Sequence, residues 1–435
     1  MQESDRPVTQ AEPPLADAPE RVILLGIDTG AYDAQSSMEE LSALALANHM
    51  EPAAEMLQRR KAPDSATVLG TGRLEEAKDL CDHLQIQSAV YDGELTGSQL
   101  RNLSTALGLP VIDRTMLILE IFKNRAVTRE GKTQTELATL EYRLPRLAGL
   151  GAEMSRQGGG GGGGAGARRG GGETKLEYDR RYIRNRIAAL KKRLATMQAR
   201  RDENRRSREK NATALVALVG YTNVGKSSLM NALTGSEIAS DDRLFVTLDP
   251  TARRLTLPDG QSVILIDTVG FVSRLPHNLI EAFQSTLEEA AYADLLLKVC
   301  DASDAKAEEQ LAVTNEVLHS LGAGAKQLLV YNKSDLVPGF KPLDPSALLV
   351  SAHTGEGLEE LKQRMTQLLA HRVRHFSICL PYDKLTLGDT VRRFGAVEEE
   401  QFGPEGVYLR GTIEASHAHL IAPYRCEPPG DKAPE

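Results

Sequence analysis

Nine consecutive residues have the types and spacing of a loop that binds phosphate. They follow the pattern G-x-x-x-x-G-K-[ST] and are Gly220, Tyr221, Thr222, Asn223, Val224, Gly225, Lys226, Ser227 and Ser228. An apolar run precedes the loop and a helical pattern follows it, so we expect a strand over 214–219 and a helix over 228–233. In such a loop backbone amides surround a β-phosphate, Lys226 reaches the β- and γ-oxygens, and Ser227 binds Mg²⁺. Taken alone, a motif this short also occurs by chance.

A second motif that a nucleotide switch requires follows this loop. An apolar run over 262–266 ends at Asp267, which begins a D-x-x-G sequence that closes with Gly270. In this motif the aspartate holds Mg²⁺ through a water molecule, and the glycine amide senses a γ-phosphate. We therefore expect Asp267 and Gly270 at the end of a strand beside the phosphate loop.

Two later motifs indicate that the bound base is guanine. Asn332, Lys333 and Asp335 follow an apolar run, and the Asp335 carboxylate can accept hydrogen bonds from two guanine N–H groups that adenine lacks. A site built for such bonds rejects an analogue without them by about 10⁴-fold or more, so it selects GTP over ATP. Ser351 and Ala352 end another short strand and look like the final guanine-contacting loop of a small GTPase domain. Four motifs in this order predict an enzyme that binds GTP and GDP and hydrolyses GTP to GDP and phosphate.

The composition is that of an ordinary multidomain protein with a small acidic excess. The chain has 435 residues, a formal net charge of −8, 41% hydrophobic residues and no tryptophan. No apolar run approaches the roughly 18 residues of a membrane span, and the chain does not begin with a basic and apolar leader. We expect a cytoplasmic monomer, with peripheral association with ribosomes or membrane as the alternative. The four cysteines are scattered without metal-ligand spacing, which favours free thiols.

The N-terminal part of the chain has the alternating pattern of an α/β domain. Residues 1–19 are rich in proline and predict a disordered tail. The domain itself is expected over 20–125, with a mainly parallel sheet. Its expected strands cover 22–26, 66–69, 88–91 and 110–113, and its expected helices cover 37–50, 73–84, 97–107 and 115–123. The short run Gly70-Thr71-Gly72 could hold a phosphate, but a plain turn is the simpler interpretation.

A helical hairpin is expected over 126–211. Apolar residues recur at alternating spacings of three and four in two segments, so two helices should pair in antiparallel fashion. The seam residues are Leu137, Leu140, Leu144 and Leu147 in the first segment, and Leu176, Ile183, Ile187, Leu190, Leu194 and Met197 in the second. Pro145 should bend the first helix near its end. The loop between the helices, 151–172, contains seven consecutive glycines over 158–164 and should be mobile in the free protein.

Residues 168–210 are strongly basic, unlike the rest of the chain. They contain 16 lysines and arginines against 6 aspartates and glutamates, a local net charge of +10. A solvated helix face explains this pattern, and so does a surface that contacts RNA phosphates. The only aromatic residues in the segment are Tyr178 and Tyr182. Recognition of RNA shape and phosphates is therefore favoured over base reading.

The central domain is expected over 212–371, a smaller module over 372–425 and a frayed tail over 426–435. The expected elements of the module are a strand over 374–380, a helix over 382–394 and two strands near 396–397 and 406–410. No catalytic constellation accompanies them, so we expect the module to dock or pack. The whole chain is predicted to be a multidomain α/β protein. It comprises an N-terminal α/β domain with an antiparallel helical hairpin, a P-loop GTPase domain with a doubly wound mixed sheet, and a small C-terminal α+β domain.

Several motifs together resemble the HflX-type, ribosome-associated GTPases, and the resemblance covers nearly the whole chain. Besides the phosphate loop, they are Arg101-Asn102-Leu103, Ile112-Asp113-Arg114-Thr115, Gly172-Glu173-Thr174, Leu244-Phe245-Val246-Thr247-Leu248-Asp249-Pro250-Thr251, Asp267-Thr268-Val269-Gly270-Phe271 and Leu275-Pro276-His277. The resemblance implies binding to the large ribosomal subunit and its RNA, and separation of stalled or idle ribosomes. The glycine loop departs from the family pattern, because it is longer and has Gly171 where a proline is usual.

The same resemblance implies roles for residues of the switch. Thr247 matches the threonine that closes over Mg²⁺ in the GTP state, with Thr251 as the second candidate and a simple turn in this loop as the alternative. Phe271 stands where many GTPases have a glutamine that orients water, and a phenyl ring cannot hydrogen-bond water. Asn223 has the position at which related GTPases with this loss hold K⁺; its alternative role is to cap the loop. The expected catalytic residues are Lys226, Thr247, Gly270 and Asn223.

A second functional hypothesis remains open. In it the chain is an RNA-binding or RNA-remodelling protein, active in ribosome assembly or unwinding, with the GTPase domain as a slow timer. The basic N-terminal half would then do the essential work. Whether the N-terminal domain also holds a second nucleotide, ATP, is left open by the sequence.

Overall fold

The computed structural model describes residues 19–147, 169–210, 213–235, 244–245, 251–274, 279, 290–415 and 417–426. The chain divides into two compact units, the first made of 1–95 with 99–114 and the second of 96–98 with 115–435. Several expectations fall outside the described residues: those for the N-terminal tail 1–18, the glycine run 158–164, Thr247, the motif 275–277 and the C-terminal tail from residue 427.

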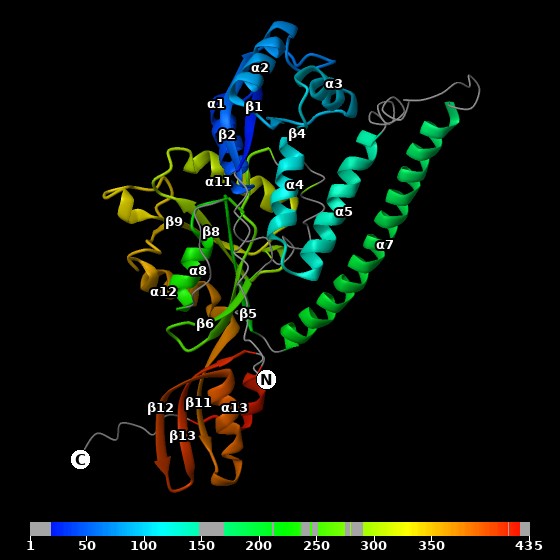
Figure 1. Cartoon of the computed structure of the whole chain (residues 1–435). Coiled ribbons are helices and arrows are strands. Elements are labelled where there is room, and N and C mark those ends of the chain that lie inside the picture. Colours follow the sequence, from blue (N-terminus) through cyan, green and yellow to red (C-terminus); the bar gives the residue numbers. More distant parts are fainter. Residues whose placement is uncertain are drawn as a thin grey trace, which may run out of the picture. The chain divides into compact units, whose positions relative to one another are not determined.

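The first unit is a four-stranded parallel sheet with strand order β2-β1-β3-β4 (Figure 1). Its elements are β1 (Glu20–Asp28), α1 (Ala34–Ala47), β2 (Met50–Arg59), α2 (Thr71–Leu84), β3 (Ser88–Tyr91), α3 (Gly97–Leu107) and β4 (Val111–Asp113). The central strands β1 and β3 are almost continuously buried, as expected of strands in a parallel sheet with both faces covered. The expected α/β domain with a parallel sheet is confirmed.

The second strand of this sheet differs from the expectation. A strand was expected over 66–69, but the structure places β2 at Met50–Arg59. The expected segment is instead part of a turn, in which the Asp64 carboxylate accepts hydrogen bonds from two following backbone amides. The apolar pattern did not indicate β2 because β2 is an edge strand, and an edge strand tolerates Pro52 and exposed polar residues. The preceding helix therefore ends earlier than expected, at Ala47.

A buried ion cluster connects helices and strands of this unit. Nη1 of Arg114 lies 2.9 Å from Oδ1 of Asp92, and Nη2 lies 2.5 Å from Oε2 of Glu40. Ser37 Oγ donates to the second carboxylate oxygen of Asp92 at 2.6 Å. Burial lowers the pKa of Arg114, but Glu40 and Asp92 outweigh it and give a net rise. Arg114, which belongs to a motif of the family resemblance, therefore stabilises this unit as the partner of two carboxylates.

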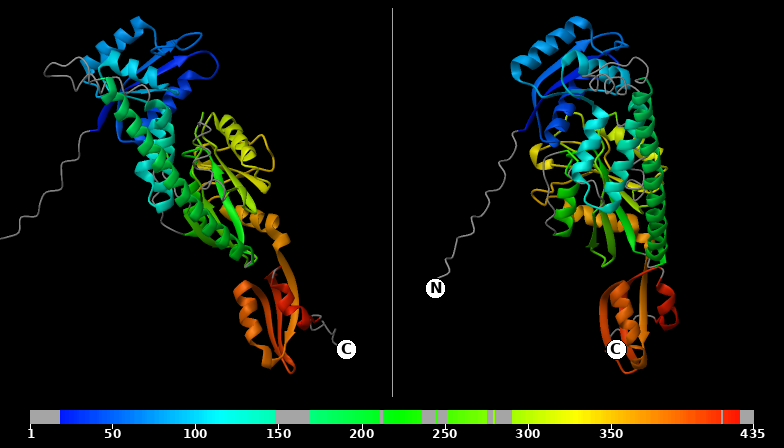
Figure 2. Two further views of the ribbon diagram at one scale, coloured as in Figure 1. Left: turned by 90° about the vertical axis from the view of Figure 1, so that its right-hand side faces the viewer. Right: turned by 45° about the vertical axis from the view of Figure 1, so that its right-hand side comes forward.

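The second unit begins with three helices, α4 (Arg114–Arg125, apart from its first residue), α5 (Arg129–Arg146) and α7 (Arg169–Lys210). Helices α5 and α7 run side by side (Figures 1 and 2). Three ion pairs join them at 2.6, 2.8 and 2.9 Å, namely Glu136 with Arg186, Glu141 with Lys191, and Glu130 with Arg201. Glu130, near the start of α5, pairs with Arg201 near the end of α7, whereas Glu136 and Glu141, farther along α5, pair with residues nearer the start of α7, so the helices are antiparallel. The expected hairpin is confirmed.

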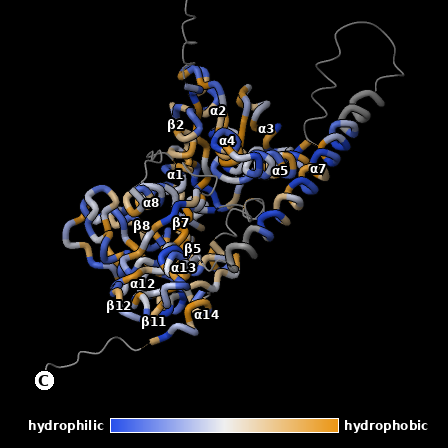
Figure 3. Tube along the Cα trace, turned by 90° about the horizontal axis from the view of Figure 1, so that it is seen from below, coloured by the Kyte–Doolittle hydropathy of each residue, from blue (hydrophilic) through white to orange (hydrophobic). Residues whose placement is uncertain are grey.

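The seam between α5 and α7 agrees with the expected apolar positions. Leu137 of α5 and Leu190 of α7 are buried. Hydrophobic and hydrophilic stretches alternate along α7 (Figure 3), as a helix with one packed side requires. α5 ends one residue after Pro145, which is consistent with the effect of proline on the preceding turn.

The start of α7 corrects the expected extent of the glycine-rich loop. The loop was expected over 151–172, whereas α7 begins at Arg169 and includes Gly170, Gly171 and Gly172. The amides of a first helical turn need no intrahelical partner. Glycines there lose backbone entropy but break no helix hydrogen bond, so the helix can begin within the glycine-rich sequence.

The central domain is built on a six-stranded mixed sheet with strand order β10-β9-β8-β5-β7-β6. Its strands are β5 (Ala214–Gly220), β6 (Thr251–Thr256), β7 (Ser262–Asp267), β8 (Leu295–Asp301), β9 (Lys326–Asn332) and β10 (Leu348–Leu349). Only the β6–β7 pairing is antiparallel among these described strands. The described α-helices include α8 (Lys226–Thr234), α11 (Ala307–Ser320) and α12 (Leu358–Leu369).

Helices cover both faces of this sheet. α8 and α12 pack against β5 on one face through a cluster that includes Val216 and Leu361, and α11 packs on the other face through a cluster that includes Val219 and Val317. The expected doubly wound mixed sheet is confirmed. β5 lies between β7 and β8, so successive connections leave it toward opposite sides of the sheet. Ligands of such sheets bind at the carboxyl ends of strands at this switch point.

The C-terminal module is the expected small α+β fold. Its main elements are β11 (Val373–Leu380), α13 (Thr386–Phe394), β12 (Gly395–Gly403), β13 (Gly406–Glu414) and α14 (Ala418–Ile421). The strands form an antiparallel sheet of order β11-β13-β12. One face of it packs on α13 around Ile378 and Val391. None of the described helices of the chain is both long enough and apolar enough to cross a membrane.

Candidate nucleotide-binding site

The phosphate-loop motif lies between β5 and α8, at the carboxyl end of the central strand. Two of its glycines are required by the close approach of other atoms. A Cβ atom on Gly220 would lie 2.2 Å from the carbonyl oxygen of Val299, and one on Gly225 would lie 2.3 Å from Nδ2 of Asn332. Gly225 also has a φ of +87°, which residues with a Cβ rarely adopt. It caps the N-terminus of α8, whose unpaired amides face the loop and favour an anion there.

Two residues of the base-reading motif hold the phosphate loop. Asn332 Nδ2 donates to the carbonyl oxygen of Val224 at 3.0 Å, and its Oδ1 accepts from the amide of Ala352 at 3.0 Å. Lys333 Nζ donates to the carbonyl oxygen of Asn223 at 3.0 Å. Three motifs that are far apart in the sequence are thereby joined by hydrogen bonds to backbone atoms. We call these residues the Asn332 network.

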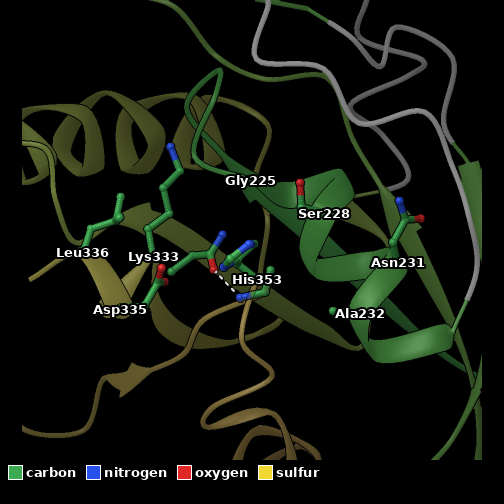
Figure 4. A pocket seen from close by; sticks show the side chains of 10 residues that line it. Gly225, Ser228, Asn231, Ala232, Lys333, Asp335, Leu336 and His353 are labelled. Carbon is green, nitrogen blue, oxygen red and sulfur yellow. Dashed lines mark hydrogen bonds between the residues drawn. The ribbon is translucent and has the colours of Figure 1, made fainter.

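Asp335 lies beside a cavity of about 580 Å³ (Figure 4). Its Oδ1 is buried and has no hydrogen-bond partner in the described part of the chain. A buried acceptor without a partner costs about 1–3 kcal/mol, and guanine N–H groups would satisfy it. The cavity is lined by Gly225, Ser228, Asn231, Ala232, Asn332, Lys333, Asp335, Leu336, Ala352 and His353. Its size, its lining and the buried oxygen fit a guanine base.

Four lining residues, Asn231, Ala232, Leu336 and His353, were not expected from the motifs. Asn231 and Ala232 of α8 lie across the cavity from Lys333 and Asp335 (Figure 4). They are three and four residues after Ser228, so helical spacing places them on the same side of α8 as that residue. This signal was present in the sequence. His353 follows Ala352 directly, but the motif assigns no role to that position.

Ser351 shapes its own loop in this structure. Its Oγ accepts from the amide of Thr354 at 3.0 Å, and its own amide donates to the carbonyl oxygen of Glu356 at 3.0 Å. Ser351 is buried, whereas Ala352 is partly exposed at the cavity. The serine therefore positions the loop, and the next residue lines the cavity.

The residues expected to bind Mg²⁺ lie together at the other end of the site. Ser227 Oγ donates to Oδ2 of Asp267 at 2.6 Å, and Asp267 is buried at the end of β7. Hydroxyl and carboxylate oxygens are hard donors of the kind that Mg²⁺ prefers, so the pair fits this ion. Thr251, the second candidate for the switch threonine, begins β6 directly opposite Asp267 in the antiparallel pairing.

Lys226 is enclosed at the centre of the site, with 7% of its surface exposed. Its Nζ donates to the carbonyl oxygens of Tyr221 and Gly220 at 2.6 and 3.2 Å. Burial lowers the pKa of Lys226 to about 8, while Asp267 acts in the opposite direction. Phosphate oxygens would supply negative charge to this buried ammonium group, so the arrangement fits a lysine that binds nucleotide phosphates.

The segment after Asp267 is attached to the phosphate loop, and we call its residues 269–274 the switch II start. The Thr222 amide donates to the carbonyl oxygen of Phe271 at 2.8 Å, and the Phe271 amide donates to the carbonyl oxygen of Gly220 at 3.1 Å. The Phe271 ring is 1% exposed and packs in the core cluster that includes Val219. The ring therefore points away from the site, and the Thr222 amide has a protein partner.

Asn223 has a left-handed backbone conformation, with a φ of +62°, and it is exposed. Asparagine is among the residues that adopt this conformation most readily. Its side-chain amide makes no hydrogen bond to any residue that the structure describes. The loop-capping bond considered for this residue is thus not present among those residues, and its amide oxygen remains available to a cation.

The loop that carries the switch threonine is described at Leu244 and Phe245 only. The Phe245 side chain is buried, and its ring meets that of Phe122 on α4 edge to face, with 4.7 Å between centroids. Its φ is +55°, an uncommon value for a bulky residue. This contact holds the loop two residues before Thr247.

Three protein-family models match the chain in sequence order. Residues 35–123 match the family described as GTP-binding GTPase N-terminal, and residues 125–208 match the GTP-binding GTPase Middle Region. Residues 215–333, which contain the phosphate loop, Asp267 and Asn332, match the family described as 50S ribosome-binding GTPase. The models thus recognise both the domain with the nucleotide motifs and the segments before it.

Curated relatives named GTPase HflX align with most of the chain. The relative from Caldanaerobacter subterraneus subsp. tengcongensis is 44% identical over 400 residues, which are 92% of each chain. The relative from Escherichia coli K12 is 37% identical over 398 residues, 90% of this chain and 92% of its own. A solved GTP-binding protein from Sulfolobus solfataricus in complex with GDP is 25% identical and covers 81% of this chain and 99% of its own, with a TM-score of 0.43. The two curated relatives named GTPase HflX are 44% and 37% identical to this chain over about nine-tenths of its length. The chain therefore belongs to the HflX family of GTPases and is an enzyme that hydrolyses GTP.

Proposed function

We propose that this GTPase binds the large ribosomal subunit in its GTP-bound state and separates stalled or idle ribosomes into subunits. The observation that carries the proposal is the basic surface of α7. Arg181, Lys192, Arg193 and Arg200 are exposed, and none of them has an ion-pair partner among the described residues. We call these four residues the α7 cations. Exposed cations without partners favour RNA, because each phosphate contact releases counterions.

The aromatic residues of α7 support RNA as the partner. Tyr178 and Tyr182 are 60% and 63% exposed and lie one helical turn apart. The Arg181 guanidinium lies 5.8 Å from the centroid of the Tyr178 ring. Exposed rings beside arginines can stack on unpaired bases, while the α7 cations contact phosphates. The alternative interpretation of this basic segment, a solvated helix face, does not require exposed tyrosines.

The nucleotide dependence follows from the site. A γ-phosphate would meet Lys226 and the amide of Gly270, and Mg²⁺ would be held by Ser227, by Asp267 through water, and by Thr247. GDP lacks the γ-phosphate, so it cannot organise the switch residues in the same way. We therefore propose that GTP favours the ribosome-binding state.

Sedimentation with purified large subunits tests this function. Binding should be stronger with a non-hydrolysable GTP analogue than with GDP. Replacing the α7 cations together by glutamine should weaken binding and reduce the slope of log affinity against log salt by about 2–4, if each contacts one phosphate. The matched control replaces four exposed arginines of the central domain and the C-terminal module, namely Arg364, Arg374, Arg393 and Arg410. Equal effects of both replacements, or none of the first, would contradict a binding role for α7.

Ribosome splitting needs a separate measurement. Whole ribosomes mixed with the protein and a GTP analogue should shift toward free subunits in a sucrose gradient, and GDP should not support the shift. The α7-cation variant should fail in this assay while hydrolysing GTP normally in the absence of ribosomes. If the protein binds large subunits but leaves whole ribosomes intact, the splitting part of the proposal is wrong.

We also propose that K⁺ assists hydrolysis through Asn223. Phe271 is directed into the core and cannot orient water, so another group must stabilise the transition state. The free amide of Asn223 at the phosphate loop can hold a cation there. Turnover should fall several-fold when Na⁺ replaces K⁺, and Asn223→Ala should abolish the difference. Equal rates in both salts, with acceleration by large subunits, would assign the missing group to the ribosome instead.

The second candidate is an RNA-remodelling protein in which GTP hydrolysis only times the action. The exposed tyrosines and cations of α7 favour it as much as they favour ribosome binding. Asp335→Asn should exchange guanine for xanthine dependence, because the amide donates where the carboxylate accepts. Ribosome splitting that changes with this exchange supports the first function, and RNA remodelling that is indifferent to it supports the second.

The Asp335→Asn protein also tests for a second nucleotide on the N-terminal domain, since residual ATP binding there would be visible. Sedimentation equilibrium tests the expected monomer.

A further inference from the structure

The Tyr221 side chain makes a contact that the phosphate-loop motif does not require. Its Oη accepts a hydrogen bond from the amide of Ser273, in the switch II start, at 2.5 Å. Tyr221 and Phe271 also form an isolated parallel β-bridge. The ring of Tyr221 packs against the apolar clusters on both faces of the sheet. Its hydroxyl is therefore held in place by the core of the domain.

Together these bonds restrict the switch II start relative to the phosphate loop. The Phe271 amide and carbonyl both bond to the loop backbone, and the Ser273 amide bonds to the Tyr221 hydroxyl. Gly270 lies directly before them and is pressed against the loop: a Cβ atom on it would lie 2.8 Å from Cα of Thr222 and 2.9 Å from Nζ of Lys226. The position of the Gly270 amide thus depends on the anchors that follow it.

We propose that the Tyr221 hydroxyl is a positioning group for GTP hydrolysis. By holding the Ser273 amide, it fixes the Gly270 amide beside the phosphate loop, where that amide meets the γ-phosphate. The hydroxyl contributes to binding of GTP and to its turnover. It does not contribute to binding of GDP, which has no γ-phosphate for Gly270. The partner on switch II is a backbone amide, so the identity of residue 221 carries the effect.

The variant Tyr221→Phe tests this role because it removes one oxygen atom and keeps the ring. One neutral hydrogen bond corresponds to a change of about 2–10-fold in an equilibrium constant. Affinity for a non-hydrolysable GTP analogue should fall by about this factor, and kcat should fall with it. Affinity for GDP should stay unchanged. This difference between nucleotides separates positioning of Gly270 from a general loss of packing, which would weaken both.

Hydrogen exchange measures the contact directly. In Tyr221→Phe, amides of a peptide that spans 270–274 should exchange faster than in the original protein with the GTP analogue bound, while amides of β9 should not change. The matched control is Tyr408→Phe, which removes a hydroxyl that lies 3.1 Å from Oγ of Ser377 in the C-terminal module. That control should leave nucleotide affinity, turnover and exchange of 270–274 as they are.

Two results would overturn the proposal. Equal losses of GDP and GTP-analogue affinity in Tyr221→Phe would make Tyr221 a packing residue of the loop. Unchanged discrimination between the two nucleotides, with unchanged exchange at 270–274, would mean that the Ser273 bond has no part in positioning Gly270.

Discussion

The buried ammonium group of Lys226 should destabilise the protein when no nucleotide is bound. Its Nζ has two carbonyl partners but little exposure to water, and burial lowers its pKa from 10.5 to about 8. This lowering of the pKa corresponds to a destabilisation of about 3 kcal/mol. We predict that Lys226→Met, which keeps the length of the side chain and removes the charge, stabilises the nucleotide-free central domain. The lost bonds to Tyr221 and Gly220 offset part of the gain, so the expected net increase is about 1–3 kcal/mol at pH 7.

The pH dependence of this effect has a definite sign. The folded state lowers the pKa of a base, so the unfolded chain binds the proton more tightly and the cost of the charge is fully present below about pH 8. The cost falls as the pH rises from about 8 to about 10.5 and is absent above that range. The cost should decrease from about 3 kcal/mol at pH 7 to about 1 kcal/mol at pH 9.5. The stability difference between variant and original protein should shrink by the same amount.

Urea denaturation of the full chain measures both quantities. The transition that GDP moves to higher urea in the original protein identifies the central domain, because a ligand stabilises the domain that binds it. The variant should unfold at higher urea than the original protein without nucleotide, and GDP should stabilise it much less. Two outcomes would refute the reasoning: a variant less stable at pH 7, or a stability difference that is the same at pH 7 and pH 9.5.

Three further perturbations have expected outcomes. Arg114→Met should destabilise the first unit by about 3–5 kcal/mol, because it leaves the buried Asp92 carboxylate without its cation. Faster hydrogen exchange in β1 and β3 with unchanged GDP affinity would show this destabilisation, and unchanged exchange would contradict it. Gly225→Ala should weaken GDP binding at least tenfold in a fluorescent-nucleotide titration, since its Cβ would displace Asn332 and its φ of +87° costs a residue with a Cβ about 1–2 kcal/mol; retained affinity would mean that the loop adapts. Leu190→Ala should lower the stability of the hairpin by about 2–5 kcal/mol, which is visible as faster hydrogen exchange in α5 and α7. GTP hydrolysis without ribosomes should stay unchanged. Slower hydrolysis would indicate a coupling between the hairpin and the nucleotide site that the described contacts do not contain.

The sequence alone predicted the fold and the site correctly where the apolar pattern of a strand leads directly into a chemical motif. Buried parallel strands such as β5 and β9 are short apolar runs that end at polar motifs, so both the strand and its site residues could be read together. The edge strand β2 could not, because its exposed face and Pro52 carry no alternation that distinguishes it from a loop. The start of α7 among glycines was also beyond a propensity argument.

Contacts within the site were less predictable than its members. The motif assigns Asn332 and Lys333 to the base, but their described side-chain contacts go to backbone atoms of other loops and, for Lys333, also to the Asp301 carboxylate at 2.7 Å. The role of Phe271 could be inferred only as the absence of a glutamine, and its direction into the core required the packing of the sheet. The bond from Ser273 to Tyr221 depends on a ring 52 positions away in the chain, and such long-range partners leave no local pattern.

The Asn332 network sets a limit on how this enzyme can be re-engineered for another nucleotide. Asp335 faces the cavity with a free carboxylate oxygen, so exchanging it alters which base is accepted without disturbing the described contacts of the phosphate loop. Asn332 offers no such freedom, because its amide group supports Val224 on one side and Ala352 on the other. An orthogonal version that answers only to xanthine nucleotides in a cell is therefore accessible by a single exchange at Asp335. Any design that begins at Asn332 would alter base choice and catalysis together, and the two effects could not be separated in the phenotype.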